Sequence, residues 1–203
     1  MTTLLRVDAE SLPRNLTLDP PLTDAEFEAL CRDNDNVQIE RTREGVIRMN
    51  PPSGGLTGDG NAEIIRQLRN WWMVHRQGRV FDSNTGFYLP DSSMLSPDAA
   101  YVVADKLKGL TKAQLTGFPR LCPDFVIELL SESDSLAKAK SKMELWIENG
   151  ATLGWLVSPY ERKVYVYRAG SRRSAVLGKS VSGVGPVEGF TFDLEEVWRC
   201  YEV

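Results

Sequence analysis

The chain has 203 residues, is 42% hydrophobic and carries a net charge of −4. That length allows one well-buried core, and the acidic balance lacks the electrostatic footprint of a tight DNA-binding protein. No stretch approaches the ~20 apolar residues that span a bilayer, and the first residues lack the basic-then-apolar pattern of an export signal. We therefore expect a cytoplasmic protein with no membrane partner.

The few cysteines and the single histidine limit the kinds of catalytic and metal-binding site that the chain could form. Cys31, Cys122 and Cys200 are odd in number and far apart, which suits a reducing compartment and offers no zinc-binding spacing. His75 is the sole histidine, so a histidine-based triad or metal site would depend on that one residue. Carboxylates are the better candidates for chemistry, and we expect His75 to be a surface or helix-end residue.

The elements predicted first along the chain are a helix, a hairpin and a loop. Residues 22–34 predict a short helix, because Thr23 and Glu26 have the spacing of a capping box. Residues 37–50 predict two strands joined by a glycine-containing turn. Residues 51–60 are rich in proline and glycine, which predicts a loop.

Helices then alternate with strands. Residues 61–78 and 133–150 carry apolar residues at helical spacing, 104–118 fit two short polar helices, and 192–198 fit a closing helical turn. Strands are predicted, in chain order, over 79–83, 86–90, 94–103, 124–130, 152–159, 163–170 and 174–178.

The order of elements between residues 61 and 158 predicts the fold class. A helix, three strands, a helix and a strand follow one another, and the crossover helix makes the last two strands parallel. We therefore expect an α/β fold of the α+β type, a mixed sheet with helices on both faces. The hairpin within residues 31–60 would add to one edge of this sheet. Residues 1–20 would form an N-terminal arm, and 21–203 a single domain.

Two Pro-Asp pairs open predicted strands. Pro97-Asp98 precedes "AAYVV", and Pro123-Asp124 precedes "FVIELL", which holds Glu128 among apolar residues. A buried carboxylate costs several kcal/mol unless it is paired or bound to a metal ion. Glu128 therefore indicates a functional site or, alternatively, a structural ion pair.

Two segments resemble the Uma2-type family of restriction-endonuclease-like proteins, which is common in cyanobacteria. They read "TGFYLPDSSMLSPDAAYV" and "LCPDFVIELLSESDSLAKAKSKMELWIENGATLGWLVSPYERKVYVYR", and the resemblance covers about residues 20–200. It implies a PD-(D/E)XK nuclease fold of a bacterial protein and hydrolysis of phosphodiester bonds with Mg²⁺ or Mn²⁺. The implied partner is nucleic acid, in the first place DNA, and cutting both strands of a duplex would favour a homodimer.

Strand spacing decides which aspartate can share a cation with Glu128. Asp124 and Glu128 are four residues apart on one strand, roughly 13 Å at ~3.3 Å per residue. Neighbouring strands lie only ~4.8 Å apart, so Asp98 is the better partner. We expect Asp98 and Glu128 to be the metal-binding and catalytic carboxylates, with Asp124 an accessory residue that caps or orients its strand.

The catalytic lysine departs from the usual motif, because Leu130 occupies the position two residues after Glu128. The resemblance places the lysine on the following helix, at Lys142. That residue lies at the edge of the apolar face, where it is not expected to be part of the core. Lys138 shares the face one turn earlier and could replace it.

The resemblance also implies two accessory residues. Glu40 matches a glutamate that the family often carries in its first hairpin, and it is either an outer metal ligand or a structural residue. Asn61 stands where many relatives have histidine; if that histidine assists catalysis in them, this chain lacks the same assistance, which counts against activity.

Two alternatives to an active nuclease remain. One is a catalytically inactive nuclease-like module that binds nucleic acid or a protein partner, which Leu130 and the net acidity favour. The other is a metal-dependent hydrolase of a different phosphate ester. Residues that could line a groove for a nucleic acid are scattered: Arg41, Arg43, Arg48, Lys138, Lys140, Lys142, Arg162, Lys163, Arg172 and Arg173.

Overall fold

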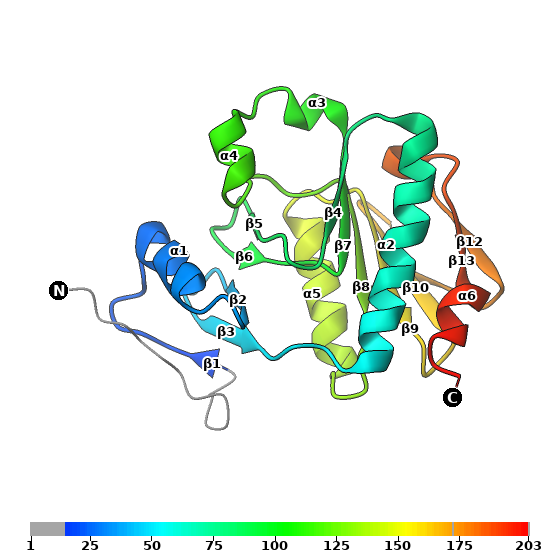
Figure 1. The fold of residues 1–203 in the computed structure, drawn as a ribbon, viewed down its shortest axis with the longest axis horizontal. Coiled ribbons are helices and arrows are strands. Elements are labelled where there is room, and N and C mark those ends of the chain that lie inside the picture. Colours follow the sequence, from blue (N-terminus) through cyan, green and yellow to red (C-terminus); the bar gives the residue numbers. More distant parts are fainter. Residues whose placement is uncertain (1–14, 172, 203) are drawn as a thin grey trace.

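The computed structural model describes residues 15–171 and 173–202, and two β-sheets organise them (Figure 1). The helices are α1 (Asp24–Asp33), α2 (Gly55–His75), α3 (Ala104–Leu107), α4 (Lys112–Thr116), α5 (Leu136–Glu148) and α6 (Leu194–Arg199), with a 3-10 turn η1 at Gly185–Val187. The strands are β1 (Asn15–Leu16), β2 (Gln38–Arg41), β3 (Ile47–Asn50), β4 (Arg79–Asp82), β5 (Phe87–Tyr88), β6 (Met94–Leu95), β7 (Ala99–Val102), β8 (Phe125–Leu129), β9 (Leu153–Ser158), β10 (Lys163–Arg168), β11 (Ser174–Val176), β12 (Ser180–Ser182) and β13 (Thr191–Asp193).

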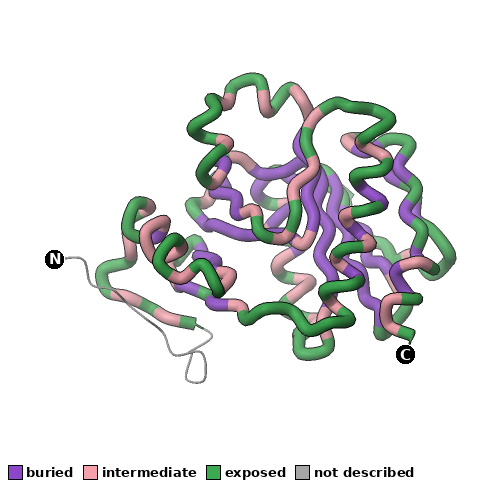
Figure 2. Tube along the Cα trace, in the orientation of Figure 1, coloured by how far each residue is buried: buried purple, intermediate pink, exposed green. Residues whose placement is uncertain are grey.

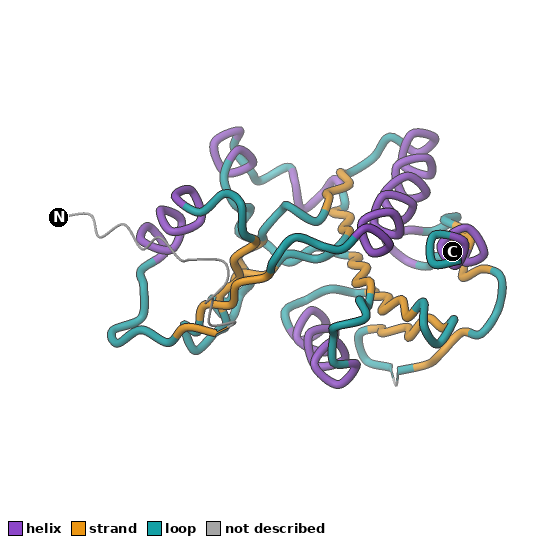
Figure 3. Tube along the Cα trace, turned by 60° about the horizontal axis from the view of Figure 1, so that its bottom comes forward, coloured by secondary structure: helices purple, strands orange, loops and turns teal. Residues whose placement is uncertain are grey.

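Helices α2 and α5 cover opposite faces of the main sheet, whose strand order is β11-β10-β9-β8-β7-β4 (Figure 3). Ile64 of α2 packs in one apolar cluster with Ile127 of β8, whereas Met143 of α5 packs in another with Val126. This alternation is the period-two pattern of a strand buried on both faces. The central strands are buried and the outer faces of the helices are exposed (Figure 2).

Strand directions bring distant segments to one edge of the main sheet. Strands β8 and β9 run parallel, with Phe125 opposite Leu153, and α5 connects them as predicted. Strand β7 runs antiparallel to β8, with Ala99 opposite Ile127. The predicted mixed sheet is therefore confirmed. The start of β7 and the ends of β8 and β9 lie at the same edge.

The hairpin β2–β3 belongs to a second sheet, of order β1-β3-β2-β6-β5, so its expected place on an edge of the main sheet was wrong. Strand β2 pairs instead with β6, where Arg41 lies opposite Met94. The strand predicted over 94–103 is divided, with β6 in the second sheet and β7 in the main sheet. Pro97 lies at the break, because a residue without an N–H cannot continue a ladder of hydrogen bonds.

Helix α2 begins at Gly55, so the loop predicted over 51–60 was too long. The Gly58 N–H donates to the Gly54 carbonyl oxygen at 2.9 Å, within the first turn. Gly60 packs closely, since a Cβ there would lie 3.0 Å from Leu129 and from Tyr201. Packing against the main sheet therefore overrides the low helix propensity of glycine.

Other local predictions are confirmed. Both hydrogen bonds of the Thr23–Glu26 capping box are present, and Gly45 in the β2–β3 turn has φ +83°. Helices α3 and α4 fall in the segment predicted for them, and α6 overlaps its predicted segment. Residues 1–14 of the predicted arm lie outside the described residues, and its boundary at residue 20 stays a prediction. No helix in the described parts of the chain has the length and apolarity needed to cross a membrane.

Two glycines at opposite ends of the α2 segment are expected to respond oppositely to alanine. Gly58 has open space around it, so Gly58→Ala should increase the free energy of unfolding by ~0.5–1 kcal/mol through helix propensity. Gly78 has φ +64°, and a Cβ there would overlap the Val102 carbonyl oxygen, so Gly78→Ala should decrease it by ~2 kcal/mol. Urea unfolding measures both, and a loss of stability in Gly58→Ala would contradict a helical start at Gly55.

Candidate active site

Asp98 and Glu128 occupy opposite register positions at the end of two paired strands. Because Ala99 lies opposite Ile127, the next step of the antiparallel register sets Asp98 opposite Glu128. Glu128 is only 8% exposed and Asp98 is half-buried. One carboxylate oxygen of Asp98 accepts from the Leu129 N–H at 2.7 Å, and the other accepts from Asn61 Nδ2 at 3.1 Å. Helix α2 and strand β8 therefore hold this carboxylate from two sides.

Lys142 reaches the same edge from α5. Its Nζ lies 3.1 Å from Glu128 Oε1, and it donates to the Ser96 carbonyl oxygen at 2.8 Å. Trp146, one turn later on the same face of α5, donates its indole N–H to Glu128 Oε1 at 2.7 Å. The Glu128 carboxylate is therefore fixed by two side chains of one helix.

Glu40 joins the cluster from the second sheet. It is 3% exposed, and its Oε1 lies 2.9 Å from Lys142 Nζ. The same oxygen accepts from the Ser96 N–H at 3.0 Å. Glu40 thus ties β2 to the segment that precedes β7. The ammonium of Lys142 lies between Glu40 and Glu128, which belong to different sheets.

The electrostatics of this cluster are dominated by burial. Burial raises the pKa of Glu128 to about 8, Lys142 opposes the rise, and Asp98 and Glu40 add to it. Burial also raises the pKa of Asp98, against the Leu129 N–H, Lys142 and Asn61. Burial alone would lower the pKa of Lys142, but Glu128, Glu40 and Asp98 outweigh it, so the pKa is raised and the ammonium persists. Glu40 and Glu128 thus contact the Lys142 ammonium, and Asp98 adds to their electrostatic effect on it; a bound metal ion would favour the ionised forms of these carboxyls.

The raised pKa of Glu128 gives the metal-free protein an expected pH dependence. The folded state holds the Glu128 proton more tightly than the unfolded chain, so this contribution to stability is full below pH ~4.5 and is lost as pH rises through ~8. Lys142 stays charged over this range. Melting temperatures in EDTA should therefore fall between pH ~5 and ~8, and less so in Glu128→Gln. Parallel curves for the two proteins would contradict the raised pKa.

Asp124 and Lys138 lie apart from this cluster. Asp124 stands before β8 at the other end of that strand, where it accepts from the Val103 N–H at 2.9 Å and pairs with Lys106 Nζ at 2.9 Å. Those contacts suit a residue that fixes the start of a strand. Lys138 is exposed on α5, and it has no ion pair among the described residues. His75 lies at the far end of α2, where its ring packs 4.7 Å from the Trp71 ring.

Sequence reasoning missed two members of the site. The Ser96 backbone accepts from Lys142 and donates to Glu40, which no side-chain pattern could reveal. Trp146 could have been found, because it lies four residues after Lys142 on the same helix face. Lys142 was expected outside the core. Its side chain is instead only 21% exposed, because its ammonium is enclosed by carboxylates of both sheets.

The oxygen donors suit a hard divalent cation. No group of three or more histidine, cysteine, aspartate or glutamate side chains among residues 15–171 and 173–202 is arranged to hold a metal ion. Mg²⁺ keeps several of its waters and needs only one or two protein carboxylates, so Asp98 and Glu128 would supply enough protein ligands for it. A bound cation would favour the ionised forms of both carboxyls and so lower the pKa values that burial raises.

A mixed sheet with a helix-linked parallel pair, and with carboxylates at the edge where that pair ends, defines a restriction-endonuclease-like protein. The model of the Uma2 family, described as "Putative restriction endonuclease", matches residues 24–195. The chain belongs to the Uma2 family, as its motifs indicated.

A solved structure has a similar fold. It is described as "a putative nuclease belonging to DUF820 from Anabaena variabilis ATCC 29413", with a TM-score of 0.72 and 19% sequence identity. The similarity covers 89% of this chain and 99% of that chain. No curated protein matches this chain. Family and fold therefore agree on a nuclease-like protein.

Proposed function

We propose that this protein is a divalent-metal-dependent endonuclease that hydrolyses phosphodiester bonds of DNA. The observation that carries the proposal is the opposition of Asp98 and Glu128 beside the enclosed ammonium of Lys142. Asp98 and Glu128 would hold Mg²⁺ or Mn²⁺, which when bound polarises a water molecule and the phosphoryl oxygen. In the reaction a water oxygen would bond to phosphorus, the bond to the departing sugar oxygen would break, and the proton that the water loses would be balanced by the one that this oxygen gains from solvent.

Lys142 supplies a positive charge that is fixed before the reaction. Glu40 and the Ser96 carbonyl oxygen hold its ammonium in place, so little reorganisation is needed when negative charge develops on the phosphate. Asn61 and Trp146 act as positioning residues. The first orients Asp98, and the second orients Glu128 through the indole N–H.

An inactive nuclease-like module is the second candidate function. It is favoured by Leu130 at the usual lysine position and by the ion pairs that Lys142 makes with Glu40 and Glu128. A metal-dependent hydrolase of another phosphate ester is the third. The inactive module would cleave no substrate, and the other hydrolase would cleave a different phosphate ester.

Incubation with three substrates separates these functions. Supercoiled plasmid, single-stranded oligonucleotide and a small phosphodiester are each incubated with Mg²⁺, Mn²⁺ or EDTA. The proposed endonuclease should nick plasmid with either metal and not in EDTA, and linear product would accompany a homodimer in solution. Binding of DNA without cleavage would indicate the inactive module. Cleavage of the small ester alone would indicate a different hydrolase.

Two Asp→Asn variants at matched Pro-Asp positions test the choice of aspartate. Asp98→Asn should lower plasmid cleavage by ~10²-fold or more, because it removes one of the charged metal ligands. Asp124→Asn should keep the cleavage rate but lose ~1–3 kcal/mol of stability, since Lys106 loses its charged partner. Cleavage rates and urea unfolding are measured on both. An inactive but stable Asp124→Asn, with Asp98→Asn active, would reverse the assignment.

A further inference from the structure

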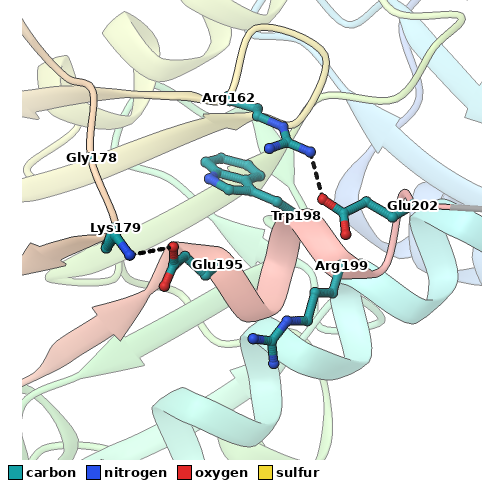
Figure 4. Close-up of a pocket in the computed structure, with 7 residues that line it drawn as sticks. All are labelled: Arg162, Gly178, Lys179, Glu195, Trp198, Arg199 and Glu202. Carbon is teal, nitrogen blue, oxygen red and sulfur yellow. Dashed lines mark hydrogen bonds and ion pairs between the residues drawn. The ribbon is translucent and has the colours of Figure 1, made fainter.

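A pocket of about 340 Å³ lies beside α6, and we call it the α6 pocket. Its cationic residues are Arg162, Lys179 and Arg199, and its carboxylates are Glu195 and Glu202. Figure 4 shows the Trp198 ring between the Arg162–Glu202 pair and the Lys179–Glu195 pair. Arg162 and Lys179 stand on either side of the Trp198 ring, whereas Arg199 points away from the ring and pairs with Glu196 (Figure 4). The proposed endonuclease chemistry uses none of these cations.

The α6 pocket lies at the same edge of the main sheet as Asp98 and Glu128. The Leu130 N–H donates to the Val157 carbonyl oxygen at 2.8 Å, so β8 and β9 end side by side. The turn after β9 carries Arg162, whose guanidinium pairs with Glu202 at 2.6 Å. Arg162 of the pocket therefore lies in the turn that follows β9, the strand paired with β8.

Two tyrosines connect the pocket to the carboxylates. The Tyr160 and Tyr201 rings pack edge to face, with centroids 5.7 Å apart. Tyr201 and Leu129 approach α2 at the same point, each 3.0 Å from where a Cβ of Gly60 would stand. Leu129 in turn donates its N–H to Asp98. Contacts therefore link Asp98 through Leu129 to Tyr201 and Tyr160, which are close in the chain to the pocket residues Glu202 and Arg162.

The cations of the pocket are available to an anion. The side chains of Arg162 and Lys179 are 62% and 82% exposed, and each has a single exposed carboxylate as its partner. Exposed ion pairs of this kind contribute little free energy, so a phosphate can replace the carboxylate at small cost. Arginine also binds phosphate oxygens in a bidentate manner. Tyr160, itself 51% exposed, offers an aromatic surface on the way, where an unpaired base can stack.

We propose that the α6 pocket binds a backbone phosphate of the nucleic-acid strand whose scissile phosphate lies at Asp98 and Glu128, with Arg162 and Lys179 as the principal contacts. This inference rests on the proposed function for the identity of the strand. It assigns the pocket to a phosphate beside the cleavage position, which would fix the strand relative to the carboxylates. Phosphate contacts of this kind set position and orientation and carry no sequence information.

Binding in the absence of metal tests the inference separately from cleavage. Fluorescence anisotropy measures the affinity of a labelled single-stranded DNA of ~15 nucleotides in EDTA at several salt concentrations. The double variant Arg162→Gln/Lys179→Gln should raise Kd by about tenfold and reduce the salt-dependence slope by about one. Glutamine keeps much of the aliphatic stem and removes the charge.

A matched double variant controls for net charge. Arg120→Gln/Lys108→Gln removes one exposed arginine and one exposed lysine, each also paired with a carboxylate, and its Kd should stay close to that of the wild type. Equal affinities of the wild type and Arg162→Gln/Lys179→Gln would overturn the inference. So would equal losses in both double variants, or no binding by the wild type at ~100 μM DNA.

The outcomes also separate this inference from the proposed function. A wild type that binds DNA through Arg162 and Lys179 but cleaves nothing in Mg²⁺ or Mn²⁺ would refute the endonuclease and leave the phosphate site. A wild type that cleaves plasmid, with an affinity unchanged by the double variant, would refute the phosphate site and leave the endonuclease.

Discussion

Glu128→Gln is expected to lower the rate of plasmid cleavage at saturating Mg²⁺ by about a thousandfold or more. The substitution keeps the size of the side chain, and the amide oxygen can still accept from Trp146. It removes a charged oxygen ligand of the proposed metal site, and a thousandfold corresponds to ~4 kcal/mol of transition-state stabilisation. Cleavage rates over a range of Mg²⁺ concentrations would separate weaker metal binding from slower chemistry.

The control for this variant is Glu148→Gln, at the exposed end of α5. It makes the same chemical change on the helix that carries Lys142, and its cleavage rate should equal that of the wild type. Melting temperatures establish that both variants are folded. A folded Glu128→Gln with wild-type turnover would remove Glu128 from the metal site and leave it as a structural ion-pair partner.

Lys142→Ala is expected to affect turnover and stability together. Turnover should fall by ~10²-fold or more, because the fixed charge near the phosphate is lost. The free energy of unfolding should fall by ~3–5 kcal/mol, because the buried carboxylates of Glu40 and Glu128 lose their partner. Cleavage kinetics and urea unfolding measure the two effects. The sequence alone suggested a loss of turnover with little change in folding.

Two further variants distinguish a catalytic lysine from a purely structural one. Lys142→Arg should recover most of the stability but only part of the turnover, since a planar guanidinium does not replace a compact ammonium. Lys138→Ala should change neither property, because that residue is exposed. Wild-type turnover in a folded Lys142→Arg would assign the residue a charge-pairing role only. Loss of turnover in Lys138→Ala alone would move the role one turn earlier on α5.

Local patterns were sufficient for most of the fold. The helical spacing of apolar residues, the capping box at Thr23 and the apolar strand around Glu128 each determine structure within a few residues. The spacing of strands was also sufficient to prefer Asp98 over Asp124 as the residue opposite Glu128. The choice between the two aspartates depends on the distance between neighbouring strands, which is nearly the same in every sheet.

Non-local packing explains what the sequence could not predict. The start of α2 depends on the close approach of Gly60 to Leu129 and Tyr201, which are far away in the chain. The second sheet depends on the pairing of β2 with β6, and that pairing places Glu40 beside Lys142. Both arrangements are decided by contacts between distant segments, where local propensity carries little information.

The α6 pocket illustrates the same limit. Arg162 was recognisable as one of many scattered basic residues, but Lys179 and Arg199 were not associated with it. The three line one pocket because α6 packs along α2, while Arg162 and Lys179 pair with Glu202 and Glu195 at and after that helix. A pocket lined by several chain segments cannot be predicted from runs of charged residues in the sequence.

The most direct test of the central claim is the position of a bound metal ion. Crystals of the protein grown with Mn²⁺, and examined by anomalous diffraction, should show one manganese peak between Asp98 and Glu128. Both carboxylates should lie ~2.0–2.3 Å from it, with Lys142 still at the edge of the site. The same experiment on Asp98→Asn should show a weaker peak or none. A full-strength peak elsewhere, with none between Asp98 and Glu128, would contradict the account.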